Sequence, residues 1–322
     1  MKKRKKAPPR KKRKPVKKGK RPAPKTKTRA KSFLLEEGSL SGLLAAKKEV
    51  QQKMDFYWRY HSELAHQRKA IESEISQVLI QTSISDFSFN SWQRSVKYKY
   101  ALHPFCTLGS LTDPGGRFNI GDIDPQNFST FSALYIALDK DTALQETQGQ
   151  VEVPGSSLIP REIALTSAGS ITIFSVSGHL DKVFDVRSTK NLKKFVALIK
   201  EFKLSKELID MARKLEEPSP EIVRQPKILH QVLQASNWRN LPMRLDVPST
   251  SQIFGQLVYF AGIEGILYTS KLTGKDCLAV YPDNFGKSDS FIELDDDPPS
   301  PKVPTRMNSE NFKICHLSFN EL

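Results

Sequence analysis

The sequence has few cysteines, no long apolar run and a first segment without acidic residues. Cys106, Cys277 and Cys315 are the only cysteines in 322 residues, and none is close to another. Their odd number and wide spacing fit reduced, small hydrophobic residues better than a disulfide framework. No stretch of about 20 apolar residues occurs, so no membrane-spanning helix and no membrane partner is predicted. Because a signal-peptide core is also lacking, we expect a soluble, intracellular protein of the cytoplasm.

Metal ligands are equally sparse. Cys315 and His316 are adjacent and would supply two ligands. The sequence has no CxxC or HxxxH pair to complete a site, and no metal is therefore predicted.

The first 31 residues contain no acidic side chain. They carry 18 of the 50 Lys and Arg, so the formal charge of +15 becomes −3 for the remaining residues, with 32 basic against 35 acidic side chains. Pro interrupts the basic blocks and apolar residues are few, which predicts a disordered, extended tail at residues 1–31. Such a tail can bind DNA or RNA without sequence preference; solubility or targeting, including nuclear localisation, is the alternative role.

The segment after the tail has helical periodicity. No Pro occurs between Leu40 and Gln81, which predicts one long helix or two. Apolar residues fall on one side of this helix at Leu64, Ile71, Ile75 and Val78. We assign residues 32–95 to an N-terminal helical segment whose apolar side packs on the rest of the chain. A self-associating coiled coil is the alternative, although Arg68 interrupts the seam.

Short β-prone runs and turns begin after Ser83. Strands are predicted at 132–138, 161–165 and 170–176, and residues 178–186 are expected to lead out of the sheet. Asp139 or Asp141 can cap a short helix that follows the first of these strands.

Helical periodicity returns in the second half of the chain. It predicts a helical insert at about 188–245 and a helix at 253–261, capped by residues 249–251 and ended by Gly262. A hairpin then joins residues 265–270 and 276–281 across Gly274, and one more strand is predicted at 312–319.

Three short segments place polar residues at strand ends or in a glycine-rich turn. The first is Gly115-Gly116-Arg117-Phe118-Asn119, and the second is the strand with Tyr135 followed by a helix of pattern Asp-x-x-x-Ala-x-x-Glu ending at Glu146. The third is the Gly-x-x-x-x-Ser strand that ends at Ser270. In this order, over about residues 98–290, the segments resemble the RES domain, a family named for its Arg, Glu and Ser.

The resemblance implies a fold and a domain arrangement. It implies an α+β, ADP-ribosyltransferase-like RES fold, to which the N-terminal helical segment and the helical insert are added. The RES-like catalytic domain would then occupy residues 96–300, and residues 301–322 would form a C-terminal segment.

The resemblance also implies an activity. Family members act on NAD as substrate and include toxins that deplete cellular NAD, each neutralised by a small antitoxin protein. The implied reaction cleaves the nicotinamide–ribose bond and passes ADP-ribose to phosphate or water, as an NAD phosphorylase or glycohydrolase. Transfer to a protein, or an inert RES-like scaffold tethered to nucleic acid by the tail, are the alternatives. We also expect an antitoxin complex or a homodimer, because the added helices offer surfaces for a partner.

The residue types suit this chemistry. Cleavage creates an oxocarbenium-like centre that the carboxylate of Glu146 can stabilise, whereas an isolated Glu of this kind would be a surface residue. Arg117 can hold a pyrophosphate bidentately or pair with a surface carboxylate, and Tyr135 can pack on nicotinamide or fill the core. Ser270 is expected to position Glu146 or a ribose hydroxyl and not to act as nucleophile. Contact with the dinucleotide is further predicted for Phe118, by stacking, and for Asn119, whose alternative role is bracing the turn.

Overall fold

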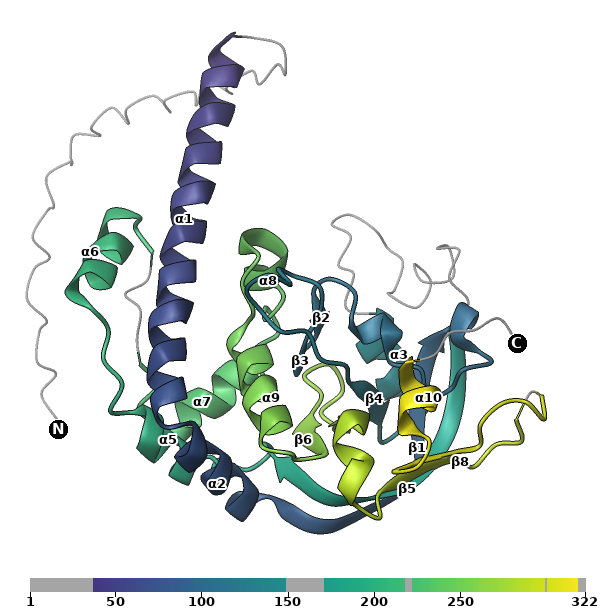
Figure 1. Cartoon of the computed structure of the whole chain (residues 1–322). Helices are drawn as coiled ribbons and strands as arrows, with labels where there is room; N and C mark the ends of the chain where they lie inside the picture. The colour runs from purple at the N-terminus through teal and green to yellow at the C-terminus, as the bar shows by residue number, and fades with distance from the viewer. Residues whose placement is uncertain (1–36, 149–170, 218–221, 299, 318–322) are drawn as a thin grey trace, which may run out of the picture. The chain divides into compact units, whose positions relative to one another are not determined.

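The computed structural model describes residues 37–148, 171–217, 222–298 and 300–317 (Figure 1). The predicted tail at 1–31, the first residues of the helical segment and the strand predicted at 161–165 lie outside these ranges. The chain divides into two compact units, Met1–Ala46 and Lys47–Leu322. Of the first unit, the described part is the start of helix α1, and the fold below is that of the second.

The N-terminal helical segment forms two helices, α1 (Glu37–Ala70) and α2 (Glu72–Thr82). Ile75 of the predicted seam is buried in the core together with Leu79, and Ile71 and Val78 of the seam pack against it. This part of the predicted seam therefore packs on the rest of the chain. The boundary at residue 95 needs correction, because residues from Ile84 onward form strand β1 and not helix.

In the described residues, the main sheet contains seven strands in the order β1-β4-β7-β6-β5-β8-β9. Their bounds are β1 (Ile84–Lys97), β4 (Leu134–Ala137), β5 (Ile171–Asp185), β6 (Gly265–Thr269), β7 (Asp276–Val280), β8 (Phe291–Leu294) and β9 (Arg306–Asn308). Strand β1 pairs with both β4 and β5, so five of these strands close into a ring. All pairs are antiparallel except β5 with β6. A separate ribbon pairs β2 (Gly115–Gly116) with β3 (Asn119–Ile120).

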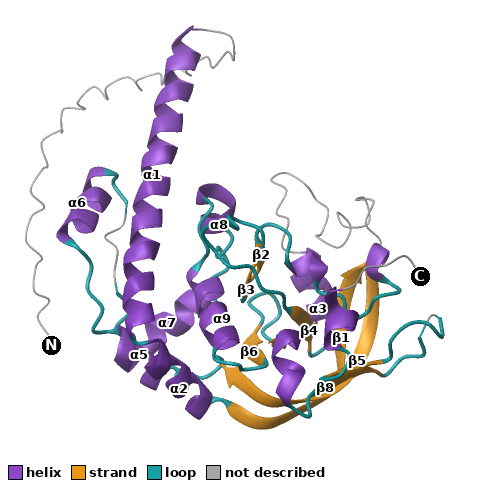
Figure 2. Cartoon of the chain, in the orientation of Figure 1, coloured by secondary structure: helices purple, strands orange, loops and turns teal. Residues whose placement is uncertain are grey.

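The helical insert supplies four of the remaining helices. They are α5 (Lys193–Ile199), α6 (Lys206–Lys214), α7 (Pro226–Leu233) and α8 (Asn240–Leu245). Helix α9 (Thr250–Phe260) begins at Ser249, whose side chain and that of Gln252 form the reciprocal bonds of a capping box. Figure 2 shows α2, α5, α7 and α9 grouped beside the sheet. The short α3 (Lys140–Gln148) lies on the other side of the β2–β3 ribbon. The insert and the helix capped at residue 249 are therefore found where the sequence predicts them.

Two predicted elements are wrong. Strand β5 continues to Asp185, so residues 178–185 belong to the sheet and do not lead out of it. Gly178 allows this continuation, because a Cβ there would meet the ring of Phe89 and the carbonyl oxygen of Phe291. The C-terminal segment predicted as a strand is instead a helix, α10 (Phe312–Leu317).

The core has two large parts on the two faces of the sheet. One contains Phe118, Phe184, Phe254 and Tyr281 under α2, α5, α7 and α9, and the other contains Phe89, Phe105, Phe174 and Phe285. All three cysteines are buried and free, as their spacing predicts. In the ranges that the structure describes, no helix has both the length and the apolar character that a bilayer crossing requires.

Candidate active site

Helix α3 and the β6–β7 hairpin meet at Glu146. The Ser270 hydroxyl donates a hydrogen bond of 2.5 Å to Oε1 of Glu146. Two further contacts join the same elements: Thr142 Oγ1 donates to Thr273 Oγ1 at 2.9 Å, and Lys275 pairs with Asp139. Asp139 also caps α3 by accepting from the backbone N–H of Thr142 at 2.9 Å. These contacts join the helix to the hairpin and hold the carboxylate of Glu146 against Ser270.

The hydroxyl of Ser270 is oriented by backbone amides. Its oxygen accepts from the N–H of Leu272 at 3.1 Å and of Thr273 at 3.3 Å. Because these amides occupy its lone pairs, the hydroxyl proton is directed at Glu146. The Ser270 hydroxyl thus holds one oxygen of Glu146, while the second oxygen has no hydrogen-bond partner among the described residues.

The glycine-rich turn packs directly on Tyr135. Gly116 has no room for a side chain, since a Cβ there would collide with the Tyr135 ring. The Tyr135 hydroxyl donates to Oδ1 of Asn119 at 2.9 Å and accepts from the N–H of Phe118 at 3.0 Å. Burial raises the pKa of Tyr135, so the hydroxyl keeps its proton at neutral pH.

Asn119 holds the turn together. Its amide nitrogen donates to the carbonyl oxygens of Ser110 and Phe131, and Oδ1 also accepts from the N–H of Gly116. Asn119 and Phe118 are both 0% exposed. Asn119 thus braces the turn and Phe118 fills the core beneath it, while their contact with the dinucleotide stays a prediction.

Helix α9 supports the turn from the opposite side. The Gln252 amide donates to the carbonyl oxygens of Pro114 and Asn119, at 2.7 and 3.0 Å. Gly255 lets the helix approach, since a Cβ there would overlap the carbonyl of Phe118. The same carbonyl accepts from the Tyr281 hydroxyl at 2.8 Å. Three buried residues, Gln252, Gly255 and Tyr281, thus fix the backbone from which Arg117 projects.

Arg117 is oriented by the helical insert. Its terminal nitrogen NH1 donates to the carbonyl oxygen of Ala235 at 2.8 Å, with Leu233 O at 3.5 Å. Its guanidinium carbon lies 5.9 Å from the ring centroid of Trp238, and that of Arg239 lies 4.6 Å from the same centroid. Among the described residues, the hydrogen-bond partners of the Arg117 side chain are the carbonyl oxygens of Leu233 and Ala235, and no carboxylate forms an ion pair with it.

These residues line a cleft of about 860 Å³. Arg117, Tyr135 and Glu146 all face it, and Ser270 reaches it through its bond to Glu146. Of the residues that the structure describes, one carboxylate, Glu146, and six cationic side chains line the cleft; the cations are Arg94, Lys97, Lys99, Arg117, Arg239 and Lys271. A body with slightly negative net charge thus has a strongly positive cleft, suited to a ligand with several negative charges.

Arg94 contributes a buried charge to the cleft wall. It is 6% exposed, and its guanidinium donates to the carbonyl oxygens of Pro104, Tyr135 and Cys106. No carboxylate in the described ranges neutralises it. Because these partners are neutral, its charge adds to the positive potential of the site.

Several cleft residues were missed by sequence reasoning. Trp238 and Arg239 come from the insert, between α7 and α8, where no periodic pattern or motif marks them. Tyr268 and Cys277 are paired across the β6–β7 hairpin and face the cleft beside Glu146. Burial, and next Glu146, raise the pKa of Cys277, so its thiol stays protonated and is unsuited to nucleophilic attack.

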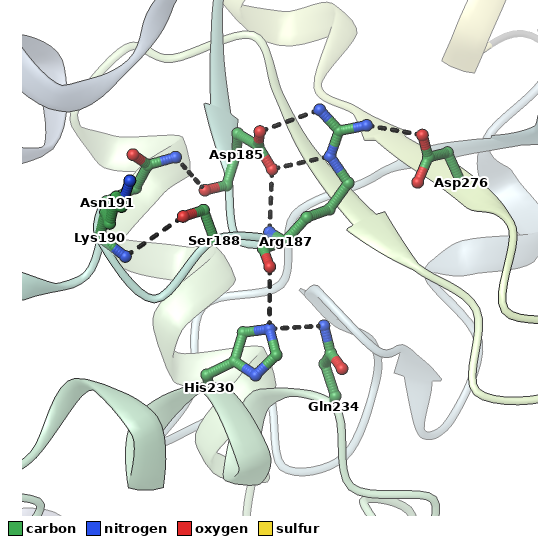
Figure 3. Close-up of polar contacts among 8 residues, drawn as sticks. All are labelled: Asp185, Arg187, Ser188, Lys190, Asn191, His230, Gln234 and Asp276. Carbon is green, nitrogen blue, oxygen red and sulfur yellow. Dashed lines mark hydrogen bonds and ion pairs between the residues drawn. The ribbon is translucent and has the colours of Figure 1, made fainter.

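A polar network fastens the insert to the sheet (Figure 3). Arg187 donates twice to Asp185 at 2.9 Å, and once to Asp276 at the start of β7 at 2.6 Å. His230 of α7 lies 3.2 Å from the carbonyl oxygen of Arg187, and the Gln234 amide lies 3.1 Å from the same ring nitrogen. The end of β5, the hairpin and α7 are therefore tied together.

The described residues contain no group of three or more His, Cys, Asp or Glu side chains that would hold a metal ion. His316, adjacent to Cys315, is instead buried, with Nδ1 3.1 Å from the Thr107 hydroxyl and Nε2 3.3 Å from Asp283. It therefore joins α10 to the cleft wall at Thr107.

The family assignment comes from comparison with known proteins. The family model of the RES domain matches residues 91–302, which is more than half of the chain. The chain belongs to the RES domain family, and the mixed helix-and-sheet architecture agrees with the predicted α+β class. No curated protein matches the sequence. Among solved structures, the M. tuberculosis MbcT–MbcA toxin–antitoxin complex contains a chain that is similar with 14% identity and a TM-score of 0.39, over 69% of this chain and 89% of its own.

Proposed function

We propose that this protein cleaves the nicotinamide–ribose bond of NAD and transfers ADP-ribose to phosphate or water. The observation that carries the proposal is the carboxylate of Glu146, which Ser270 holds in a cleft whose other charged lining residues, in the described part of the chain, are cations. NAD carries two phosphates and reacts through a positively charged ribose, so it needs cations at one end and a carboxylate at the other. Membership of the RES family supports this substrate and an ADP-ribosyltransferase-like fold.

Each residue has a role in the proposed reaction. As the bond to nicotinamide breaks, its electron pair leaves with the neutral nicotinamide, and positive charge develops on the ribose. The free oxygen of Glu146 stabilises that charge, while Ser270 keeps the carboxylate in one orientation. Arg117 binds a phosphate through the N–H groups that the insert carbonyls leave free. Tyr135 presents its ring to the cleft, because its hydroxyl is occupied by the turn.

The acceptor is proposed to be phosphate or water, with transfer to a protein as the alternative. The six cations that line the cleft favour an anionic acceptor, because each lowers the free energy of a bound phosphate. Phosphate attack forms a C–O bond at the ribose and yields a phosphorylated ADP-ribose, whereas water yields ADP-ribose and a proton.

The test is incubation of the purified full chain with NAD, with and without inorganic phosphate. We expect nicotinamide release and identify the second product by its mass. Phosphorylated ADP-ribose identifies a phosphorylase, and ADP-ribose alone identifies a glycohydrolase. Absence of nicotinamide under both conditions refutes the proposal.

Family membership also supports a toxin-like role in the cytoplasm with a neutralising antitoxin. Expression of the wild type is expected to deplete cellular NAD and arrest growth. Expression of Glu146→Gln should do neither. Equal growth arrest by wild type and Glu146→Gln would exclude NAD depletion as its cause.

A further inference from the structure

We propose that Arg239, supplied by the helical insert, is a second substrate-binding cation that holds the pyrophosphate of a dinucleotide together with Arg117. This inference rests on the proposed function, because it names the group that binds the phosphates of the same substrate. Both guanidinium carbons lie beside one aromatic ring, at 5.9 Å and 4.6 Å from the centroid of Trp238. Trp238 is buried and thus provides a fixed surface that sets the position of both cations.

Arg117 has donors left for a ligand. Of its five N–H groups, those on NH1 are directed at the carbonyl oxygens of Leu233 and Ala235. Nε and the other terminal nitrogen have no hydrogen-bond partner in the described part of the chain. Because its partners are neutral carbonyls, the charge of Arg117 is held in place without being neutralised.

Arg239 is also without a counter-ion. No carboxylate of the described ranges lies within ion-pair distance of it, and its side chain opens to the cleft. Partial desolvation, and next the charge of Arg117, lower the pKa of Arg239, whereas Glu146 opposes the change. Arg117 and Glu146 are therefore both close enough to influence Arg239. Two neighbouring cations repel each other, and an anion bound between them removes that repulsion.

The chemistry of the pair indicates a diphosphate. Each guanidinium presents parallel N–H donors that match the oxygens of one phosphate. A pyrophosphate can therefore engage both arginines at once, whereas a mononucleotide has one phosphate for the two. The Arg187 side chain joins Asp185 at the end of β5 to Asp276 of the hairpin that carries Ser270. The carbonyl oxygen of Arg187 lies 3.2 Å from His230 of the insert that carries Arg239 (Figure 3). The insert and the hairpin are thereby linked through the end of β5.

The experiment measures ADP-ribose and AMP binding by titration calorimetry with the full chain. Arg239→Ala is expected to weaken ADP-ribose binding at least about tenfold and AMP binding at most about threefold. Arg239→Lys, which keeps the charge but not the fork, should fall between Ala and wild type. Arg213→Ala is the matched control, because Arg213 lies exposed on α6 and pairs with Asp210; it should bind within about twofold of wild type. With NAD as substrate, Arg239→Ala should raise KM and leave kcat within about threefold.

ADP-ribose binding by Arg239→Ala within twofold of wild type overturns the proposal. Equal losses for AMP and ADP-ribose also overturn it, because they show distortion of the cleft and not a second phosphate contact. If circular dichroism shows that Arg239→Ala unfolds at a lower temperature than the wild type, Arg239→Gln is measured in its place. A wild type that binds ADP-ribose through Arg239 but releases no nicotinamide refutes the proposed reaction and leaves this binding site standing. A wild type that binds no ADP-ribose refutes the site itself.

Discussion

Replacing Tyr135 by Phe tests how the glycine-rich turn is held. The hydroxyl joins two fully buried residues, by accepting from the N–H of Phe118 and donating to Oδ1 of Asn119. Without it, the buried N–H loses its partner, which costs about 1–3 kcal/mol. The bond to Asn119 contributes roughly 0.5–1.5 kcal/mol more, because Oδ1 keeps its bond from Gly116. We therefore expect Tyr135→Phe to lower the free energy of unfolding by about 1.5–4.5 kcal/mol.

Urea unfolding followed by circular dichroism measures this change. The midpoint should fall while the dependence on urea stays constant, since the surface exposed on unfolding is unaltered. Tyr98→Phe is the control, because Tyr98 is 67% exposed. Loss of its hydroxyl should change the free energy of unfolding by less than about 0.5 kcal/mol. A loss below about 1 kcal/mol for Tyr135→Phe would refute the reasoning, because it would mean that water from the cleft replaces the hydroxyl.

Three further predictions concern stability. Gly255→Ala should lower the free energy of unfolding by about 1–3 kcal/mol in urea, although Ala favours helix, because its Cβ would overlap the carbonyl of Phe118; an unchanged midpoint would contradict the close approach. Burial, and next Arg68, lower the pKa of His61 to about 3, so the unfolded chain binds a proton that the folded chain does not, and stability falls as pH drops from about 6.5 towards 3. His61→Leu should remove up to about 1.4 kcal/mol per pH unit from that slope, and equal slopes would contradict it. Arg187→Ala should cost about 1–2 kcal/mol, against less than about 0.5 for the exposed Arg213→Ala, measured by the same unfolding assay.

Local signals predicted the elements that surround the site. The cap predicted at residues 249–251 is formed by Ser249, and the structure adds a reciprocal bond from Gln252 that completes a capping box. The hairpin across Gly274 likewise depends on local chemistry, because Gly274 has a positive φ of 73°. The proximity of Glu146 and Ser270 followed from the family motif, since 124 residues separate them and no local pattern connects them.

Tertiary contacts decided the elements that were wrongly predicted. Residues 312–319 have β-prone apolar residues, yet Phe312, Cys315 and His316 are buried at helical spacing while Ile314 is 71% exposed. Gly178 indicated the end of a strand, but its lack of a side chain makes room for Phe89 inside the sheet. Trp238 and Arg239 could not be assigned to the site, because the chain brings them to Arg117 only through the packing of the insert.

The role of Glu146 is tested most directly by nicotinamide release from NAD by wild type, Glu146→Gln and Glu293→Gln. Glu293 lies on β8, pairs with Arg306 and does not line the cleft, so it controls for loss of a carboxylate elsewhere. We predict that Glu146→Gln keeps the fold and its bond from Ser270 but lowers kcat by about 10²–10³, because the amide cannot neutralise the developing ribose charge. Glu293→Gln should match wild type. Equal kcat for Glu146→Gln and wild type would contradict the proposed function.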